Sequence, residues 1–276
     1  MKNLLIRTAT GAVYVALIVA ALFIPPLLYV LFLAFALIGV YEYSRMTSSA
    51  GDKPAVIYWM VCAALMLLSG FSTNLASYNG NLYMLPIVLT SLLVLACVAL
   101  PIFELFRAKE HPLQNVANGL WGIVWIALPL TVLSFAVFND DQYAVLSFFI
   151  LLWSADTFAF LGGSLLGKHK LCERISPAKT WEGFFVGLLL TVGMAIGLSK
   201  IPAFDVLGSS TLKWIGFALL IDVFGTCGDL VESMFKRSAG LKDSGKILPG
   251  HGGILDRLDS ALLAAIPAMI YFYLVN

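Results

Sequence analysis

Apolar stretches long enough to cross a bilayer recur along almost the whole chain. A membrane-spanning helix needs about 20 mostly apolar residues. Apolar runs, read against polar, proline and glycine breaks, predict about nine helices, with approximate ranges 8–24, 27–43, 54–70, 82–103, 117–138, 143–161, 180–200, 212–235 and 254–275. The polar segments between them are too short for a separate soluble domain. The sequence therefore predicts an all-α, polytopic integral membrane protein.

The composition agrees with this fold class. The chain is 60% hydrophobic and 12% charged, whereas soluble domains carry about 25% charged residues. We expect one membrane domain over residues 1–276, in which 1–140 are amino-terminal spans and 141–276 carry the chemistry. The four cysteines lie far apart without a C-x-x-C pair, which argues against a disulfide framework or a zinc site.

The distribution of charge orients the predicted helices. If the amino terminus is cytoplasmic, every lysine and arginine except Lys200 and Lys213 falls on the cytoplasmic side, as the positive-inside rule requires. Pro25 and Pro26 lead from the first apolar stretch directly into a second one, which favours a pair of spans over a cleaved signal peptide. The two longest polar segments, 162–179 and 236–253, then lie on the cytoplasmic face, where nucleotides are available.

The second polar segment and its flanking helices concentrate basic, acidic and glycine residues. Basic residues alone are explained by the topology rule. Gly252 and Gly253 would let backbone amides approach a ligand just before a helix begins, and such a helix start binds anions readily. His251, between two glycines, is a candidate phosphate contact, and we do not assign it as a general base.

The positive-inside rule does not explain the acidic residues on both sides of this segment. Asp256 and Asp259 are three residues apart, so they share one face of the last helix. One carboxylate could simply complement the helix dipole, but this does not account for both. The preceding helix carries a polar stripe, formed by Asp222, Asp229, Ser233 and Lys236. A charge within a span costs roughly 2.5–3.5 kcal/mol and is usually paired or functional. Carboxylates beside a basic glycine turn predict a magnesium-nucleotide site.

The first polar segment offers a second set of candidates. Asp156 lies inside an apolar run, which is unusual for a carboxylate. Ser176 followed by Pro177 is typical of a helix start, with serine as the cap and Lys179 in the first turn, where it could hold a phosphate. Many ordinary helices begin in the same way. His169, between two lysines, is expected to be a surface residue.

From Ser233 to Asp259 the chain meets every constrained position of the signature S-x-[LIVMF]-K-R-x4-K-D-x-[GSA]-x2-[LIF]-[PG]-x-H-G-G-[LIVMF]-x-D-R-[LIVMFT]-D. On these residues the chain resembles the phosphatidate cytidylyltransferases, also called CDP-diacylglycerol synthases. The similarity extends to 228–233 and 176–183, and the first 140 residues match only as generic spans. One departure is Phe158, where bacterial relatives often have glycine in Asp-x-Gly-Ala.

The resemblance implies that CTP and phosphatidic acid give CDP-diacylglycerol and pyrophosphate, with magnesium as cofactor and a second cation left open. It also implies a bacterial cytoplasmic (inner) membrane protein among membrane lipids, a homodimer by analogy, and no nucleic-acid partner. The acids matching the family's metal ligands are Asp229 and Asp256. The candidate catalytic residues are Asp229, Lys236, Arg237, Lys242, Asp243, His251, Asp256, Arg257 and Asp259. The candidate substrate-binding residues are Asp156, Ser176, Lys179, Glu182, Ser233, Gly252 and Gly253.

Two other function classes stay open at this point. A CTP-using polyprenol kinase would need similar loops and acids but would transfer the γ-phosphate. A transporter would use Asp156, Asp222 and Asp229 to line an ion path, although neither repeated halves nor broken helices are clear in the sequence. A CDP-alcohol phosphotransferase would need D-G-x2-A-R, which the chain lacks.

Overall fold

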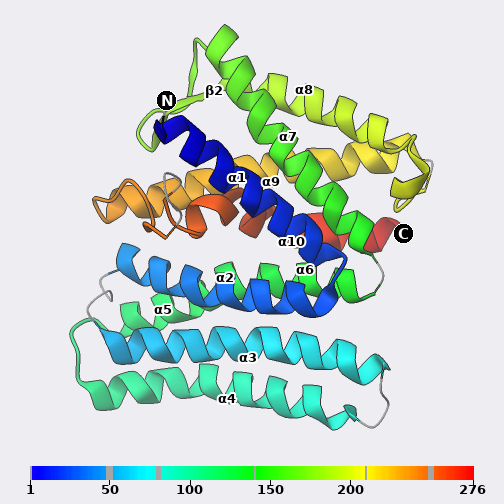
Figure 1. Cartoon of the computed structure of the whole chain (residues 1–276). Helices are drawn as coiled ribbons and strands as arrows, with labels where there is room; N and C mark the ends of the chain where they lie inside the picture. The colour runs from blue at the N-terminus through cyan, green and yellow to red at the C-terminus, as the bar shows by residue number, and fades with distance from the viewer. Residues whose placement is uncertain (1, 48–51, 79–81, 140, 209, 248–251) are drawn as a thin grey trace. The chain divides into compact units, whose positions relative to one another are not determined.

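The structure is a computed structural model that describes the backbone of residues 2–47, 52–78, 82–139, 141–208, 210–247 and 252–276, and the side chains of these residues except 2–9 and 78. Helices dominate it (Figure 1). The α-helices are α1 (Lys2–Leu22), α2 (Pro25–Met46), α3 (Lys53–Tyr78), α4 (Met84–Arg107), α5 (Pro112–Gly122), α6 (Leu128–Phe138), α7 (Gln142–Leu166), α8 (Trp181–Leu198), α9 (Thr211–Ser238) and α10 (Leu255–Val275). The shorter elements are the π-helix η2 (Ile123–Ala127), the strands β1 (Lys170–Cys172) and β2 (Ser176–Thr180), and the 3-10 helix η3 (Pro202–Phe204).

The predicted fold class is confirmed. Within the described ranges, 8 helices are long and apolar enough to cross a membrane, with α5, η2 and α6 counted together as Pro112–Phe138. The described apolar part of α1, Thr10–Leu22, is shorter than a span. The prediction of about nine spans is therefore close to the number found.

The long helix from 112 to 138 is interrupted by a π-helical turn. The N–H of Leu128 bonds to the carbonyl of Ile123, five residues earlier, immediately before Pro129. Proline has no N–H to donate and disturbs regular helix bonding, and a π turn is one way to absorb that disturbance without ending the helix. The span therefore continues through its proline.

The chain forms two compact units. Unit 1 comprises Met1–Asn139 together with Asp243–Asp256, and unit 2 comprises Asp140–Lys242 together with Arg257–Asn276. The carboxyl-terminal loop and the first two residues of α10 thus belong to the same unit as the amino-terminal helices. The remainder of α10 belongs to unit 2.

In unit 1, helices α2, α3 and α4 lie side by side, and α6 packs on α2 and α3 (Figure 1). Aromatic rings fill the interior: the ring centroids of Tyr43 and Trp125 are 5.9 Å apart, and those of Tyr43 and Trp59 are 6.4 Å apart. Gly122 permits this packing, because a Cβ there would lie 2.8 Å from the Tyr43 ring. The packing fixes the end of α2 that carries Glu42.

In unit 2, helices α7 and α8 make the most extensive contact, and α9 packs on both. Small residues allow the close approach: a Cβ at Gly183 would lie 2.7 Å from the carbonyl oxygen of Ala159. Gly228 of α9 likewise packs against the backbone of Asp259 in α10. Close contacts through small residues are typical of membrane helices, and here they bring Asp229 and Asp259 into one neighbourhood.

Candidate functional site

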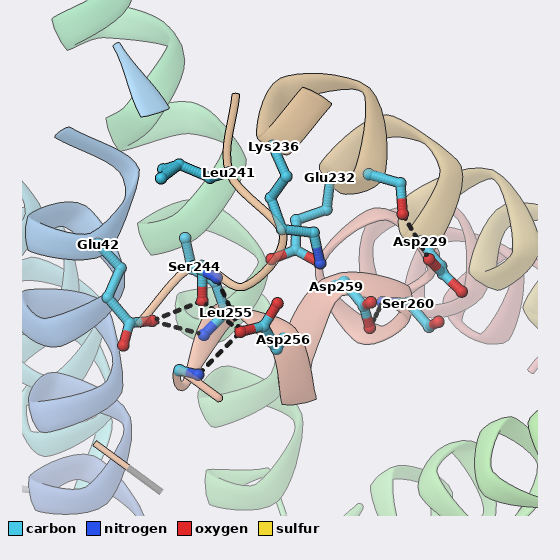
Figure 2. A network of polar contacts seen from close by, with 12 residues as sticks. Glu42, Asp229, Glu232, Lys236, Leu241, Ser244, Leu255, Asp256, Asp259 and Ser260 are labelled. Carbon is cyan, nitrogen blue, oxygen red and sulfur yellow. Dashed lines mark hydrogen bonds and ion pairs between the residues drawn. The ribbon is translucent and has the colours of Figure 1, made fainter. Parts of the chain in front are cut away.

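Asp256 is held by a ring of hydrogen-bond donors in unit 1. Its Oδ2 atom accepts hydrogen bonds from the N–H of Ser244 (2.9 Å), the hydroxyl of Ser244 (2.8 Å) and the N–H of Gly253 (2.8 Å) (Figure 2). We call Glu42, Ser244, Gly253, Leu255 and Asp256 the Asp256 cluster. Charge-assisted hydrogen bonds from several donors fix a carboxylate in place, so Asp256 is rigidly oriented.

The glycines of the loop serve this arrangement. Gly252 has a φ of +83°, a left-handed conformation that favours glycine, and a Cβ there would lie 2.5 Å from Asp256 Oδ2. A Cβ at Gly253 would overlap the Ser244 hydroxyl. The sequence predicted that these glycines let the backbone approach a ligand, and in the structure the backbone approaches a carboxylate of the chain itself. His251 lies outside the described residues.

A second group of charges surrounds Asp229 in unit 2. The Lys179 ammonium lies 2.7 Å from Asp229 Oδ2, and the two side chains are 24% and 29% exposed. The Ser233 hydroxyl donates to Asp229 Oδ1 at 3.1 Å, so these two members of the predicted stripe share one face of α9. We call Asp156, Lys179, Asp229, Ser233 and Asp259 the Asp229 cluster.

Further carboxylates lie near this ion pair. The electrostatic neighbours of Asp156 include Lys179, Asp229 and Asp222. Those of Asp259 include Asp229, Asp156 and Lys236. Asp222 itself is 2% exposed within α9. Like charges gathered at one place repel one another unless cations compensate them, so this cluster is suited to hold a cation.

Oxygen donors of this kind suit magnesium. The described residues contain no group of three or more His, Cys, Asp or Glu side chains arranged to hold a metal ion. Magnesium at a nucleotide site needs only one or two carboxylates, because water and phosphate oxygens supply its other ligands. The carboxylates present therefore fit a magnesium-nucleotide site without a complete protein cage.

The adjacent basic residues Lys236 and Arg237 have different surroundings. Lys236 is 8% exposed, and its ammonium lies 2.9 Å from Glu232 Oε2, while Glu232 is fully buried. Arg237 is exposed and donates to the carbonyl of Leu241 at 3.1 Å, which ties down the turn after α9. Lys242, Asp243 and Arg257 are exposed.

The predicted helix start at Ser176 and Pro177 is wrong. Ser176–Thr180 forms β2, which pairs antiparallel with β1. The helix begins at Trp181, and the side chain of Thr180 caps it by accepting a hydrogen bond from the N–H of Gly183 at 3.2 Å. The pairing of the two strands keeps residues 176–180 extended. The helix therefore cannot begin at Ser176 and Pro177, although this dipeptide is typical of a helix start. Lys179 consequently lies on the strand and reaches Asp229 from there.

Glu182 anchors the turn that precedes this hairpin. Its Oε2 atom accepts from the N–H groups of Lys168 (3.0 Å) and His169 (3.1 Å), and its Oε1 atom lies 2.5 Å from His169 Nδ1. The His169 side chain is 77% exposed, as predicted for a surface residue. The Glu182 carboxylate therefore shapes the polar segment in the structure; its predicted contact with substrate stays a prediction.

Two acidic residues with structural contacts, one in each unit, were missed by sequence reasoning. Glu42, near the end of α2, contacts Ser244 and Leu255. Glu232 pairs with Lys236. Both signals were present in the sequence, since Glu42 is a carboxylate in an apolar helix and Glu232 stands four residues before a lysine.

Comparison with known proteins gives a consistent result. The model of a family described as "Cytidylyltransferase family" matches residues 5–275. A protein of Haemophilus influenzae named phosphatidate cytidylyltransferase is 31% identical over 287 residues, covering 97% of each chain. Proteins of the same name from Staphylococcus aureus (strain COL) and Rickettsia conorii are each 36% identical, over 174 and 157 residues. The S. aureus match covers 63% of this chain and 65% of that protein, which is just under two thirds of its length.

Proposed function

This chain belongs to the cytidylyltransferase family, and we propose that it transfers CMP from CTP to phosphatidic acid, giving CDP-diacylglycerol and pyrophosphate. The observation that carries the proposal is the likeness over 97% of both chains to a protein named phosphatidate cytidylyltransferase. The apolar helices support it, because they are long and apolar enough to cross the membrane in which a diacyl lipid substrate lies.

In the proposed reaction an oxygen of the phosphatidic acid phosphate attacks the α-phosphorus of CTP. The bond between that phosphorus and the oxygen that bridges to the β-phosphorus breaks, and pyrophosphate leaves with the electron pair. A phosphate monoester is already nucleophilic at neutral pH, so we propose that positioning and charge stabilisation supply most of the rate, without a covalent enzyme intermediate. This fits a site of lysines and carboxylates.

We propose that Asp229 and Asp256 are magnesium ligands. The proposal leaves open whether a second cation also binds. The ion, when bound, would polarise phosphate oxygens and offset the charge that develops on pyrophosphate. Lys179 is suited to exchange partners, because its ion pair with Asp229 is only about three-quarters buried, and an arriving phosphate can take the place of the carboxylate. Lys236, Arg237, Lys242 and Arg257 are the proposed further phosphate contacts.

We also propose that the protein lies in a bacterial cytoplasmic membrane with its amino terminus and active site in the cytoplasm. The uneven distribution of lysine and arginine between the two predicted sides supports this orientation. A homodimer is proposed by analogy with the family.

The proposal is tested with purified protein in detergent, given CTP, phosphatidic acid and magnesium. We expect CDP-diacylglycerol and pyrophosphate in equal amounts, and neither product when magnesium is removed by a chelator. Consumption of CTP without any cytidylyl lipid would contradict the proposal.

A further inference from the structure

Glu42 is a buried carboxylate to which the proposed reaction assigns no role. It lies near the end of α2 and is 1% exposed. A carboxylate withdrawn from water is costly unless hydrogen bonds compensate it. Its position in an otherwise apolar helix therefore requires specific donors.

Two hydrogen-bond donors to Glu42 come from the carboxyl-terminal loop and from the first residue of α10, both in unit 1. Glu42 Oε2 accepts a hydrogen bond from the N–H of Leu255 at 2.9 Å and from the hydroxyl of Ser244 at 3.2 Å (Figure 2). Leu255 is the first residue of α10, and N–H groups in the first turn of a helix have no partner within the helix. Glu42 therefore caps α10 from another helix, where a negative charge also complements the helix dipole.

The Ser244 hydroxyl links Glu42 to Asp256. It lies 3.2 Å from Glu42 Oε2 and 2.8 Å from Asp256 Oδ2. A hydroxyl carries a single proton to donate, so the two carboxylates share it. The guanidinium of Arg45, three residues after Glu42, also donates to the carbonyl of Ser244 at 3.4 Å. One end of α2 thus holds the residue that supplies two of the three donors to Asp256.

The loop is also shaped around the Glu42 side chain. A Cβ at either Gly245 or Gly253 would overlap the Glu42 carboxylate. The N–H of Gly253 is the third donor to Asp256. The glycines therefore allow the backbone to close on both carboxylates together.

We propose that Glu42 is a positioning residue for the cytidylyl transfer. It holds Ser244 and Leu255 and so fixes the orientation of the Asp256 carboxylate. This proposal rests on the proposed function, because it assigns Asp256 to the magnesium-dependent reaction. It gives the amino-terminal helices, which lie outside the signature of residues 233–259, a part in the chemistry.

The test uses Glu42→Gln, which keeps the shape of the side chain and removes its charge. Glu104→Gln is the matched control, because Glu104 is also 1% exposed in unit 1 and bonds to Arg107 and Asn115. We expect Glu42→Gln to lower kcat about ten- to hundredfold and to raise the magnesium concentration for half-maximal activity, as the loss of a residue that orients a metal ligand does. The magnesium requirement of Glu104→Gln should equal that of the wild type.

Hydrogen–deuterium exchange of peptides covering 243–256 provides a readout that does not depend on activity. Glu42→Gln should speed exchange in these peptides, and Glu104→Gln should not. A double-mutant cycle of Glu42→Gln with Ser244→Ala should show less than additive loss of kcat, since both changes break the same link.

Unchanged exchange at 243–256 in Glu42→Gln, or faster exchange with the wild-type magnesium requirement and kcat, would overturn the positioning role. Wild-type protein that makes no CDP-diacylglycerol would instead contradict the proposed function. A failure of the proposed function therefore appears in the wild-type protein, whereas a failure of the positioning role appears only in Glu42→Gln.

Discussion

The Asp256 cluster and the Asp229 cluster hold carboxylates in two different ways. In the first, neutral N–H and O–H donors surround Asp256, and glycines bring the backbone close to it. In the second, Asp229 pairs with a lysine, and both side chains are about a quarter exposed. The first arrangement is fixed by the fold, while the second is partly exposed, as the proposed exchange of its partner for a cation or phosphate requires.

The contacts of Asp256 should also contribute more to stability than the ion pair of Asp229. A hydrogen bond to a charged group contributes about 1.5–3 kcal/mol, whereas a partly exposed ion pair contributes roughly 0–1 kcal/mol. Substitutions in the Asp256 cluster should therefore affect both stability and activity, and substitutions in the Asp229 cluster mainly activity.

Asp229→Asn should have the largest effect on turnover. We expect activity to fall on the order of a thousandfold, because the proposed metal ligand is lost while the shape is kept, and the thermal unfolding midpoint should stay within about 2 °C of the wild type because the lost ion pair contributes little. Asp205→Asn, at an exposed aspartate of unit 2, is the control and should match the wild type. Wild-type turnover in Asp229→Asn would remove Asp229 from the site.

Lys179→Ala tests the Asp229 cluster by removing the lysine that pairs with Asp229. We expect about a hundredfold loss of kcat/KM for CTP, since one proposed phosphate contact is removed from the site, with little change in unfolding. Lys170→Ala, at an exposed lysine of the same hairpin, should keep nearly full activity. Equal loss in the two variants would mean that only the overall charge of the hairpin matters.

Gly253→Ala tests the fixed character of the Asp256 cluster. The added Cβ would overlap the Ser244 hydroxyl and the Glu42 carboxylate, so we expect a loss of about 1–3 kcal/mol in stability, typical of overpacking, together with a loss of activity. Thermal unfolding in detergent measures the first effect. Gly197→Ala is the control, because a Cβ there meets nothing within 4 Å. A Gly253→Ala protein as stable as the Gly197→Ala control would show that the loop is not tightly closed.

The smallest expected effect concerns the helix that follows the hairpin. Thr180→Ala removes the cap of α8 and should cost about 1 kcal/mol of unfolding free energy. Ser176→Ala should cost much less, because Ser176 lies on β2 and not at the cap. Denaturation of the two variants in parallel measures the difference, and the reverse order would favour the helix start that the sequence suggested.

The sequence was informative where the signal is local. Length and hydropathy of each apolar run predicted an all-α membrane fold with nearly the right number of spans, because a bilayer imposes helix length on each segment separately. The stripe of α9 followed from helical periodicity, and the contact between Ser233 and Asp229 confirms that these two share a face. A serine and an acid of one helix could be placed together without knowledge of the rest of the chain.

Long-range contacts were beyond such reasoning. The pairing of Lys179 with Asp229 links a strand to a helix, and strand pairing of residues 176–180 overrode a local pattern for a helix start. Glu42 contacts residues more than 200 positions later. No periodicity in α2 indicates that contact, because its partner is a loop formed by another part of the sequence.

The most direct test of the proposed reaction is the fate of each phosphate of CTP. Wild-type protein in detergent should be given phosphatidic acid and magnesium with CTP labelled at the α- or at the γ-phosphate. Transfer of CMP predicts that α-label enters the lipid and γ-label appears only in pyrophosphate. Entry of γ-label into the lipid would contradict the account and indicate a kinase.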